Sequence, residues 1–242
     1  MNLQGMRNLK ILCIGDSLTY GNVGYSYIPF LNKNILTSNK GINGETLYGV
    51  SNRLKKILDS DNDFDIIILG IGANDVLLPY LKEVDSYWKV QMSFRCKFKK
   101  CIENDLDFAR QFEALVKMIK GSSKKAIIWG IPYMNLTKFP NDIVIRRNQK
   151  IKLICENYGY DFIDIYTLQN DVLPQEIKAY SWKWSFLTRI SDAISMTLFP
   201  ESKNWFANKR GLVQTVDGVH FSSKTASILA KEMERKIVKK WS

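Results

Sequence analysis

Residues 9–14 read Leu-Lys-Ile-Leu-Cys-Ile, and the polar turn Gly-Asp-Ser-Leu-Thr follows at 15–19. A short run of mostly aliphatic side chains is typical of a β-strand buried on both faces, as in a parallel sheet. Further along the chain, similar apolar runs predict four more strands, at 35–39, 65–69, 126–129 and 161–165. The run at 35–39 is the weakest of them.

Longer segments between these runs carry apolar residues at helical spacing, which predicts amphipathic helices. The expected helices are one with Thr46 as its cap and Val50, Leu54, Ile57 and Leu58 on one face, one from about Phe108 to Gly121, one at 143–158 ended by Gly159, and one that starts after Ser222 or Ser223 and carries Leu229, Met233 and Ile237. Alternating strands and helices predict an α/β fold, a three-layer α/β/α sandwich around a central five-stranded parallel sheet. Active sites in such folds lie beyond the carboxyl ends of the strands.

The composition is that of an ordinary globular protein, with 45% hydrophobic and 24% charged residues among 242. This length suits one domain covering 1–242. Four scattered cysteines without zinc or redox spacing indicate reduced thiols, and this pattern argues against a Cys96–Cys101 disulfide. With no secretion signal in the sequence and no apolar run long enough to cross a bilayer, we expect a cytoplasmic protein.

The net charge of +11 comes largely from dispersed lysines. Nucleic-acid modules usually concentrate their cations on one element, and the sequence contains no such module. We therefore expect no specific nucleic-acid partner. Weak association with an anionic surface or an anionic substrate stays open, and the oligomeric state cannot be predicted from the sequence.

Polar residues follow three of the predicted strands and one late loop. Ser17 lies in the turn after the first strand, Gly44 after the second and Asn74 after the third. A serine there can act as a nucleophile, and an asparagine amide can stabilise an oxyanion. Taken singly, these residues are explained as well by a helix cap, a glycine turn and an Asx turn.

The only histidine, His220, stands three residues after Asp217 in a polar loop before the last predicted helix. Any imidazole chemistry of this chain must use it. Its place in a polar loop, rather than on an apolar stripe, favours a functional role over a structural one.

Four blocks together resemble the GDSL/SGNH hydrolases, in the order that the family has them. The blocks are Gly15-Asp16-Ser17-Leu18-Thr19, Asn39-x-Gly41-x-x-Gly44-Glu45-Thr46, Gly72-Ala73-Asn74-Asp75 and Asp217-Gly218-Val219-His220. Each block is weak alone, but the ordered set spans nearly the whole chain. The resemblance implies a flavodoxin-like SGNH-hydrolase fold.

The resemblance also implies a serine hydrolase that cleaves carboxylic esters through an acyl-enzyme. Ser17 would be the nucleophile, His220 the general base and Asp217 the residue that orients it. The backbone N–H groups of Ser17 and Gly44 and the amide of Asn74 would form the oxyanion hole, and Asp16 would support the turn. The mechanism requires no metal and no organic cofactor.

The substrate is a small-molecule ester whose class stays open: short acyl or acetyl esters first, with lysophospholipids and thioesters as further members. The segment at about 165–216, rich in aromatic residues, is expected to form a lid or insertion beside the site, with an extra helix packed on the sheet as an equal alternative. An acyltransferase using the same triad on a carbohydrate acceptor is the alternative. A non-enzymatic basic protein that binds anions is a more distant one.

Overall fold

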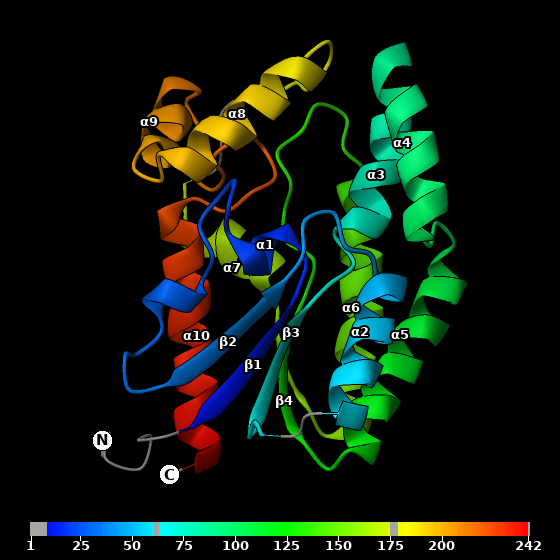
Figure 1. Cartoon of the computed structure of the whole chain (residues 1–242), viewed down its shortest axis with the longest axis vertical. Helices are drawn as coiled ribbons and strands as arrows, with labels where there is room; N and C mark the ends of the chain where they lie inside the picture. The colour runs from blue at the N-terminus through cyan, green and yellow to red at the C-terminus, as the bar shows by residue number, and fades with distance from the viewer. Residues whose placement is uncertain (1–8, 61–62, 175–178, 242) are drawn as a thin grey trace.

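A computed structural model describes residues 9–60, 63–174 and 179–241 of the chain (Figure 1). Its centre is a five-stranded sheet in the order β2-β1-β3-β4-β5, and every pair of neighbouring strands is parallel. The strands are β1 (Lys10–Gly15), β2 (Leu36–Gly41), β3 (Ile66–Gly70), β4 (Lys125–Trp129) and β5 (Asp161–Ile163). The α/β fold with a five-stranded parallel sheet, predicted from the sequence, is confirmed.

Burial along the strands follows their place in the sheet. All of β3 is buried, and β1 and β4 each expose only their first residue. In contrast, β2 is exposed at every position before Gly41. This strand is an edge strand, with a neighbour on one side only, and that explains why its apolar run is the weakest of the five.

Helices cover both faces of the sheet (Figure 1). On one face lie α2 (Leu47–Ser60), α5 (Asp105–Gly121) and α6 (Asn141–Tyr158). The other face is covered by α10 (Ser223–Trp241), whose Leu229, Met233 and Ile237 are fully buried, and α7 (Ile165–Val172) lies beside it. The short 3₁₀ helix η2 (Ile28–Phe30) contacts α10.

The remaining helices gather at the end of the molecule where the strands finish. They are α1 (Ser17–Tyr20), α3 (Asn74–Lys82), α4 (Ser86–Lys99), α8 (Phe186–Leu198) and α9 (Ser202–Lys209). In Figure 1, α3 and α4 stand on one side of this end, and α8 and α9 on the other.

Several predicted boundaries were wrong by a few residues. The fifth strand ends at Ile163 instead of 165, because the Asp164 side chain accepts the N–H of Thr167 and caps α7. Gly121 is the last residue of α5, whose C-cap is Ser122, and α6 begins at Asn141. Gly159 does end α6, in the left-handed conformation that favours glycine.

Thr46 stands at the expected N-cap position of α2, where its carbonyl accepts the N–H of Val50 at 3.0 Å. The Thr46 hydroxyl donates to the Lys99 carbonyl at 2.5 Å, so it is engaged elsewhere. The N–H of Leu47 instead donates to Asp75 Oδ2 at 2.8 Å. The first turn of α2 is therefore held by a carboxylate from α3, a partner that no local pattern predicts.

Among the described residues, none of the helices has both the length and the apolarity needed to cross a membrane. The segment 165–216 contains α7, α8 and α9, and its residues 175–178 lie outside the described part of the chain. Its role as a lid or insertion of one domain stays a prediction.

Candidate active site

The side chains of Ser17, Asp217 and His220 meet beyond the carboxyl end of β1, although Ser17 precedes the other two by 200 residues or more in the sequence. His220 Nε2 lies 3.1 Å from Ser17 Oγ, and His220 Nδ1 lies 2.9 Å from Asp217 Oδ2. With a proton on Nδ1, the imidazole donates to Asp217, and Nε2 is left to accept the proton of the Ser17 hydroxyl. The arrangement is able to draw a proton away from Ser17 along a defined path.

Ser17 is positioned by the tight turn that leaves β1. Asp16 is extended and its Oδ1 accepts the N–H of Leu18 at 2.9 Å, which starts α1. That helix is a single turn ended by Gly21, too short to contribute much of a helix dipole. Any stabilisation of negative charge next to Ser17 must therefore come from individual N–H groups.

The loop that carries Asp217 and His220 is held by its own aspartate. Asp217 Oδ1 accepts the N–H groups of Val219 and His220 at 3.0 and 2.9 Å, while Oδ2 faces the imidazole. Gly218 between them has φ +91°, a conformation that side-chain-bearing residues rarely adopt. A Cβ at this position would lie 2.6 Å from Leu136.

Two buried carboxyl groups of the site have opposite pKa shifts. Burial alone would raise the pKa of Asp217, but the charge and hydrogen bonds of His220, with Arg189 nearby, hold it well below its usual value. Asp217 thus stays ionised beside the imidazole. Burial raises the pKa of Asp16 to about 7, and the neighbouring Asp75 and Glu45 add to the rise.

The groups expected to form an oxyanion hole line one cavity beside His220. Ser17, Gly44 and Asn74 all line it together with His220. The N–H groups of Ser17 and Gly44 have no protein acceptor in the part of the chain that the structure describes. Gly44 has φ +65°, a conformation that favours glycine, and the guanidinium group of Arg95 lies where a Cβ would be placed.

Asn74 departs from the simplest picture of a free donor. Its amide Nδ2 donates to the Glu45 carbonyl at 2.9 Å and to Asp16 Oδ2 at 3.3 Å. The second bond is the longer of the two and lies beyond the usual range for an N–H···O hydrogen bond. The amide is thus held at the rim of the cavity by the first two sequence blocks.

Sequence reasoning missed the role of Asp75, although this residue stands in the third block. Its carboxylate accepts the N–H of Leu47 with one oxygen and the N–H of Ile102 with the other, at 2.8 and 2.9 Å. It thereby ties α3 to α2 and to the segment after α4. Burial raises its pKa to about 6, and these hydrogen bonds and Arg147 oppose the rise.

Lys203 was also missed, and nothing in the sequence points to it. Its buried ammonium group donates to the carbonyls of Gly21 and Gly24, both at 2.8 Å. Burial lowers its pKa. Because a Cβ on Gly24 would contact His220 Cβ at 2.7 Å, this lysine of α9 holds a loop that packs directly against the Cβ of His220 and the backbone of Phe221.

A cavity of about 380 Å³ opens beside Ser17 and His220. Its walls are mostly apolar and come from α3, α4 and α8, with Leu77, Trp88, Met92, Phe186 and Ile190 among the lining residues. Most ligand pockets combine such walls with a few polar groups. The lining suits an apolar group placed next to the serine.

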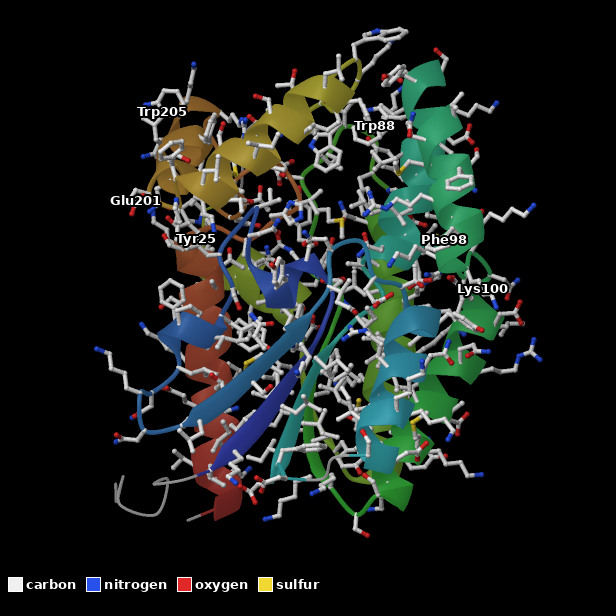
Figure 2. All side chains as sticks on the ribbon, in the orientation of Figure 1. Tyr25, Trp88, Phe98, Lys100, Glu201 and Trp205 are labelled. Atoms are coloured by element: carbon white, nitrogen blue, oxygen red, sulfur yellow. The ribbon has the colours of Figure 1, made fainter. Side chains whose placement is uncertain are left out.

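Aromatic residues beside this cavity join α4 to the loop that carries Asp217 and His220. Trp88 stacks on Trp182 at 5.5 Å between ring centroids, and its indole N–H donates to the Trp182 carbonyl at 2.8 Å. Trp182 in turn donates its indole N–H to the Asp217 carbonyl at 2.7 Å. Figure 2 shows Trp88 on the side of α4 that faces α8. The aromatic-rich segment thus contacts the site directly at Trp182.

The four cysteines are free thiols, and the Sγ atoms of Cys96 and Cys101 are neighbours. Within the described ranges, no three His, Cys, Asp or Glu side chains are grouped to hold a metal ion.

Comparison with known proteins agrees with the fold and with the sequence blocks. Residues 11–233 match the model of the GDSL-like lipase/acylhydrolase family. No curated protein sequence matches the chain significantly. Solved structures with similar folds include a lipase/acylhydrolase from Enterococcus faecalis, at 18% identity and a TM-score of 0.62, with 97% of each chain covered.

Two further structures with the same fold are esterases. A carbohydrate acetylesterase from Sinorhizobium meliloti is 14% identical with a TM-score of 0.59, over 96% of this chain and 99% of that one. A variant of an acetyl-xylooligosaccharide esterase from Geobacillus is 21% identical with a TM-score of 0.56, over 96% and 94%. At these identities the likeness shows the fold alone.

The class that the fold and the family model define is that of the carboxylic ester hydrolases. The chain belongs to the GDSL-like lipase/acylhydrolase family, as its four sequence blocks predicted.

Proposed function

We propose that the chain hydrolyses small carboxylic esters through a Ser17–His220–Asp217 triad and an acyl-enzyme. The observation that carries the proposal is the continuous hydrogen-bond path from Ser17 Oγ through the imidazole to the Asp217 carboxylate, at 3.1 and 2.9 Å. The free N–H groups of Ser17 and Gly44 on the same cavity support it.

In the first half-reaction, Ser17 Oγ bonds to the ester carbonyl carbon as its proton passes to His220 Nε2. The resulting oxyanion is stabilised by the N–H groups of Ser17 and Gly44 and by the Asn74 amide. The imidazolium then gives its proton to the alkoxide as the bond between carbon and the alcohol oxygen breaks. The alcohol leaves, and the acyl group stays on Ser17.

In the second half-reaction, His220 takes a proton from water, and the water oxygen attacks the acyl carbon. The bond to Ser17 Oγ breaks, and the proton returns to Ser17 as the carboxylic acid leaves. Asp217 keeps the imidazole in the right tautomer and stabilises its charged form, without itself taking a proton. Its low pKa fits this role.

The substrates that we propose are esters of short acyl groups, acetyl esters included. A cavity of about 380 Å³ with apolar walls has room for a short or medium acyl chain. The carbohydrate acetylesterase and the acetyl-xylooligosaccharide esterase that share this fold support the same range of substrates. Lysophospholipids, which carry longer acyl chains, and thioesters are further substrates to be tested beside them.

The test is hydrolysis of p-nitrophenyl esters of increasing chain length by the wild type, Ser17→Ala and His220→Ala. We expect each substitution to abolish turnover, since triad residues act as a unit. Activity of the wild type should also fall on acidification, because an imidazolium cannot accept the serine proton. Turnover close to wild type in either correctly folded variant would disprove the proposal.

Adding alcohol or sugar acceptors to the same assay separates hydrolysis from acyl transfer. A hydrolase releases the free acid at an unchanged rate, whereas an acyltransferase forms a new ester at the expense of the acid. A chain that turns over no ester but binds anions would instead be the non-enzymatic alternative.

A further inference from the structure

Helix α4 carries an apolar stripe that is largely exposed among the described residues. Tyr87, Val90, Phe94 and Phe98 recur at helical spacing, so they share one side of the helix. Their exposed fractions are 48, 70, 76 and 74%. The opposite side of α4 is buried and carries Trp88, Met92 and Cys96.

Helix α8 repeats the same pattern at the same spacing. Leu187, Ile190, Ile194 and Leu198 form its exposed stripe, with exposed fractions between 45 and 70%. The only charged residues of this helix, Arg189 and Asp192, are buried and paired with each other. The exposed surface of α8 is therefore free of charge.

The charged residues within 86–100 all have one sign: Lys89, Arg95, Lys97, Lys99 and Lys100. Of these, Lys99 is paired with Glu45. Lys89 and Lys97 are exposed and have no acidic partner within the described ranges. A helix with aromatic residues on one side and lysines beside them is typical of segments that lie in a membrane–water interface.

Each stripe reaches a residue that lines the cavity. On α4, the ring of Tyr87 packs edge-on against Phe186, which lines the cavity, and on α8 the stripe residue Ile190 lines the cavity itself. Both helices project from the end of the molecule where the strands finish (Figure 1). Figure 2 shows Phe98 and Lys100 near one end of α4.

We propose that α4 and α8 dock on an anionic lipid surface and that the ester substrate enters the cavity from that surface. The apolar stripes would enter the headgroup region while Lys89 and Lys97 contact the anionic headgroups. The part of this proposal that concerns the substrate rests on the proposed ester hydrolysis; the docking itself does not.

A second copy of the chain is a poorer occupant of the same surface. A symmetric dimer through α4 would bring Lys89 and Lys97, which have no acidic partner within the described ranges, near their own copies, between two chains that each carry +11. Such pairing of like charges is unfavourable. An anionic lipid surface complements the same charges.

The test measures binding of the full-length Ser17→Ala chain to vesicles by co-sedimentation at moderate salt. This variant keeps both stripes but does not consume the lipid. We expect binding to phosphatidylcholine vesicles that contain phosphatidylglycerol, and much weaker binding to phosphatidylcholine alone. Adding Lys89→Gln and Lys97→Gln should lower the affinity roughly tenfold or more, and so should Phe94→Ser with Phe98→Ser.

Matched controls come from surfaces away from the cavity. Lys56→Gln with Lys117→Gln removes two exposed lysines of α2 and α5, and Leu153→Ser removes an exposed leucine of α6. These variants should bind like the parent. Equal loss in the controls, equal binding to both vesicle types, absence of binding, or a dimer in place of vesicle binding would each overturn the proposal.

Hydrolysis of a short water-soluble ester by the wild type, measured in parallel, keeps the two proposals apart. If that ester is hydrolysed but the vesicles are not bound, docking fails and the proposed function stands. If the vesicles are bound but no ester is hydrolysed, the proposed function fails instead. The Phe94 and Phe98 variants should hydrolyse the soluble ester at the wild-type rate, since both side chains lie outside the cavity lining.

Discussion

The loops at the strand ends and the helices α4 and α8 form two parts of one site with very different construction. The loops hold buried polar groups, such as Asp16, Asn74 and Asp217, in networks of short hydrogen bonds. The two helices hold apolar walls together through aromatic contacts, and much of their outer surface is exposed. The first construction fixes atoms for chemistry, and the second shapes a space for a substrate.

The comparison predicts separate effects on kinetics. Changes in the strand-end loops should lower kcat for every ester, because they act on the shared reaction. Changes in the helices should mainly affect KM, and more so for longer acyl groups. The predictions below test this division, beginning with the largest effect.

Asp217→Asn should lower kcat by about 10⁴-fold while KM changes little. The asparagine can still accept the backbone N–H groups of Val219 and His220, but its NH₂ group cannot accept the Nδ1 proton of the imidazole. His220 would then hold the wrong tautomer toward Ser17. Steady-state kinetics with a short p-nitrophenyl ester measure this effect, and a loss below tenfold would show that Asp217 does not orient the base.

Asn74→Ala should lower kcat by roughly a hundredfold to a thousandfold, the usual cost of losing one oxyanion donor. Asn43→Ala is the matched control, since Asn43 also lines the cavity but has no role in the mechanism. We expect the control to retain most of its activity on the same esters. Equal losses in both variants would mean that Asn74 supports the local structure only.

Asp16→Asn should change how stability depends on pH. The folded-state pKa of Asp16 is raised to about 7, above its unfolded value, so the folded state binds more protons between these values. Stability contributed by this group is therefore lost as pH rises through this window. The unfolding free energy of the wild type minus that of the variant should fall by more than about 1 kcal/mol from about pH 5 to pH 7.

Urea unfolding of both proteins at the two pH values gives this difference directly. Other titrating groups, such as Asp75, are present in both proteins and largely cancel. A difference that stays constant, or that rises with pH, would contradict the raised pKa of Asp16.

Asp85→Ala should have the smallest effect and should act on the helices alone. Asp85 caps α4 by accepting the N–H groups of Tyr87 and Trp88, and its second oxygen accepts the N–H of Trp184. Loss of a cap costs about 1 kcal/mol of stability. Because the same carboxylate joins α4 to the segment that leads into α8, KM for longer acyl esters should rise while kcat for short ones is kept.

Asn104→Ala is the matched control for this change. Asn104 caps α5 in the same way, by accepting the N–H groups of Leu106 and Asp107, but none of these residues lines the cavity. Thermal unfolding should show similar losses in both variants. If KM also rises in the control, the link between α4 and α8 has no special role in substrate binding.

The sequence by itself determined the fold and located those parts of the proposed reaction centre that are local in the chain. Buried aliphatic runs and helical stripes predicted the parallel sheet, because both patterns follow from which side chains must leave water. The glycines and polar residues after the strands could be located because parallel strands end at one edge of the sheet. The turn at Gly218 and the cap at Asp16 involve only neighbours in sequence.

Only the tertiary structure decided the contacts between distant segments. Asp75 accepts an N–H of the first turn of α2, Lys203 donates to the loop that packs on His220, and Trp182 donates to the Asp217 carbonyl. These contacts join residues that lie tens to hundreds of positions apart. No local pattern records such pairs, since each depends on how whole elements pack. The same holds for the exposed stripes of α4 and α8, whose periodicity predicts a helix but not which of its sides faces water.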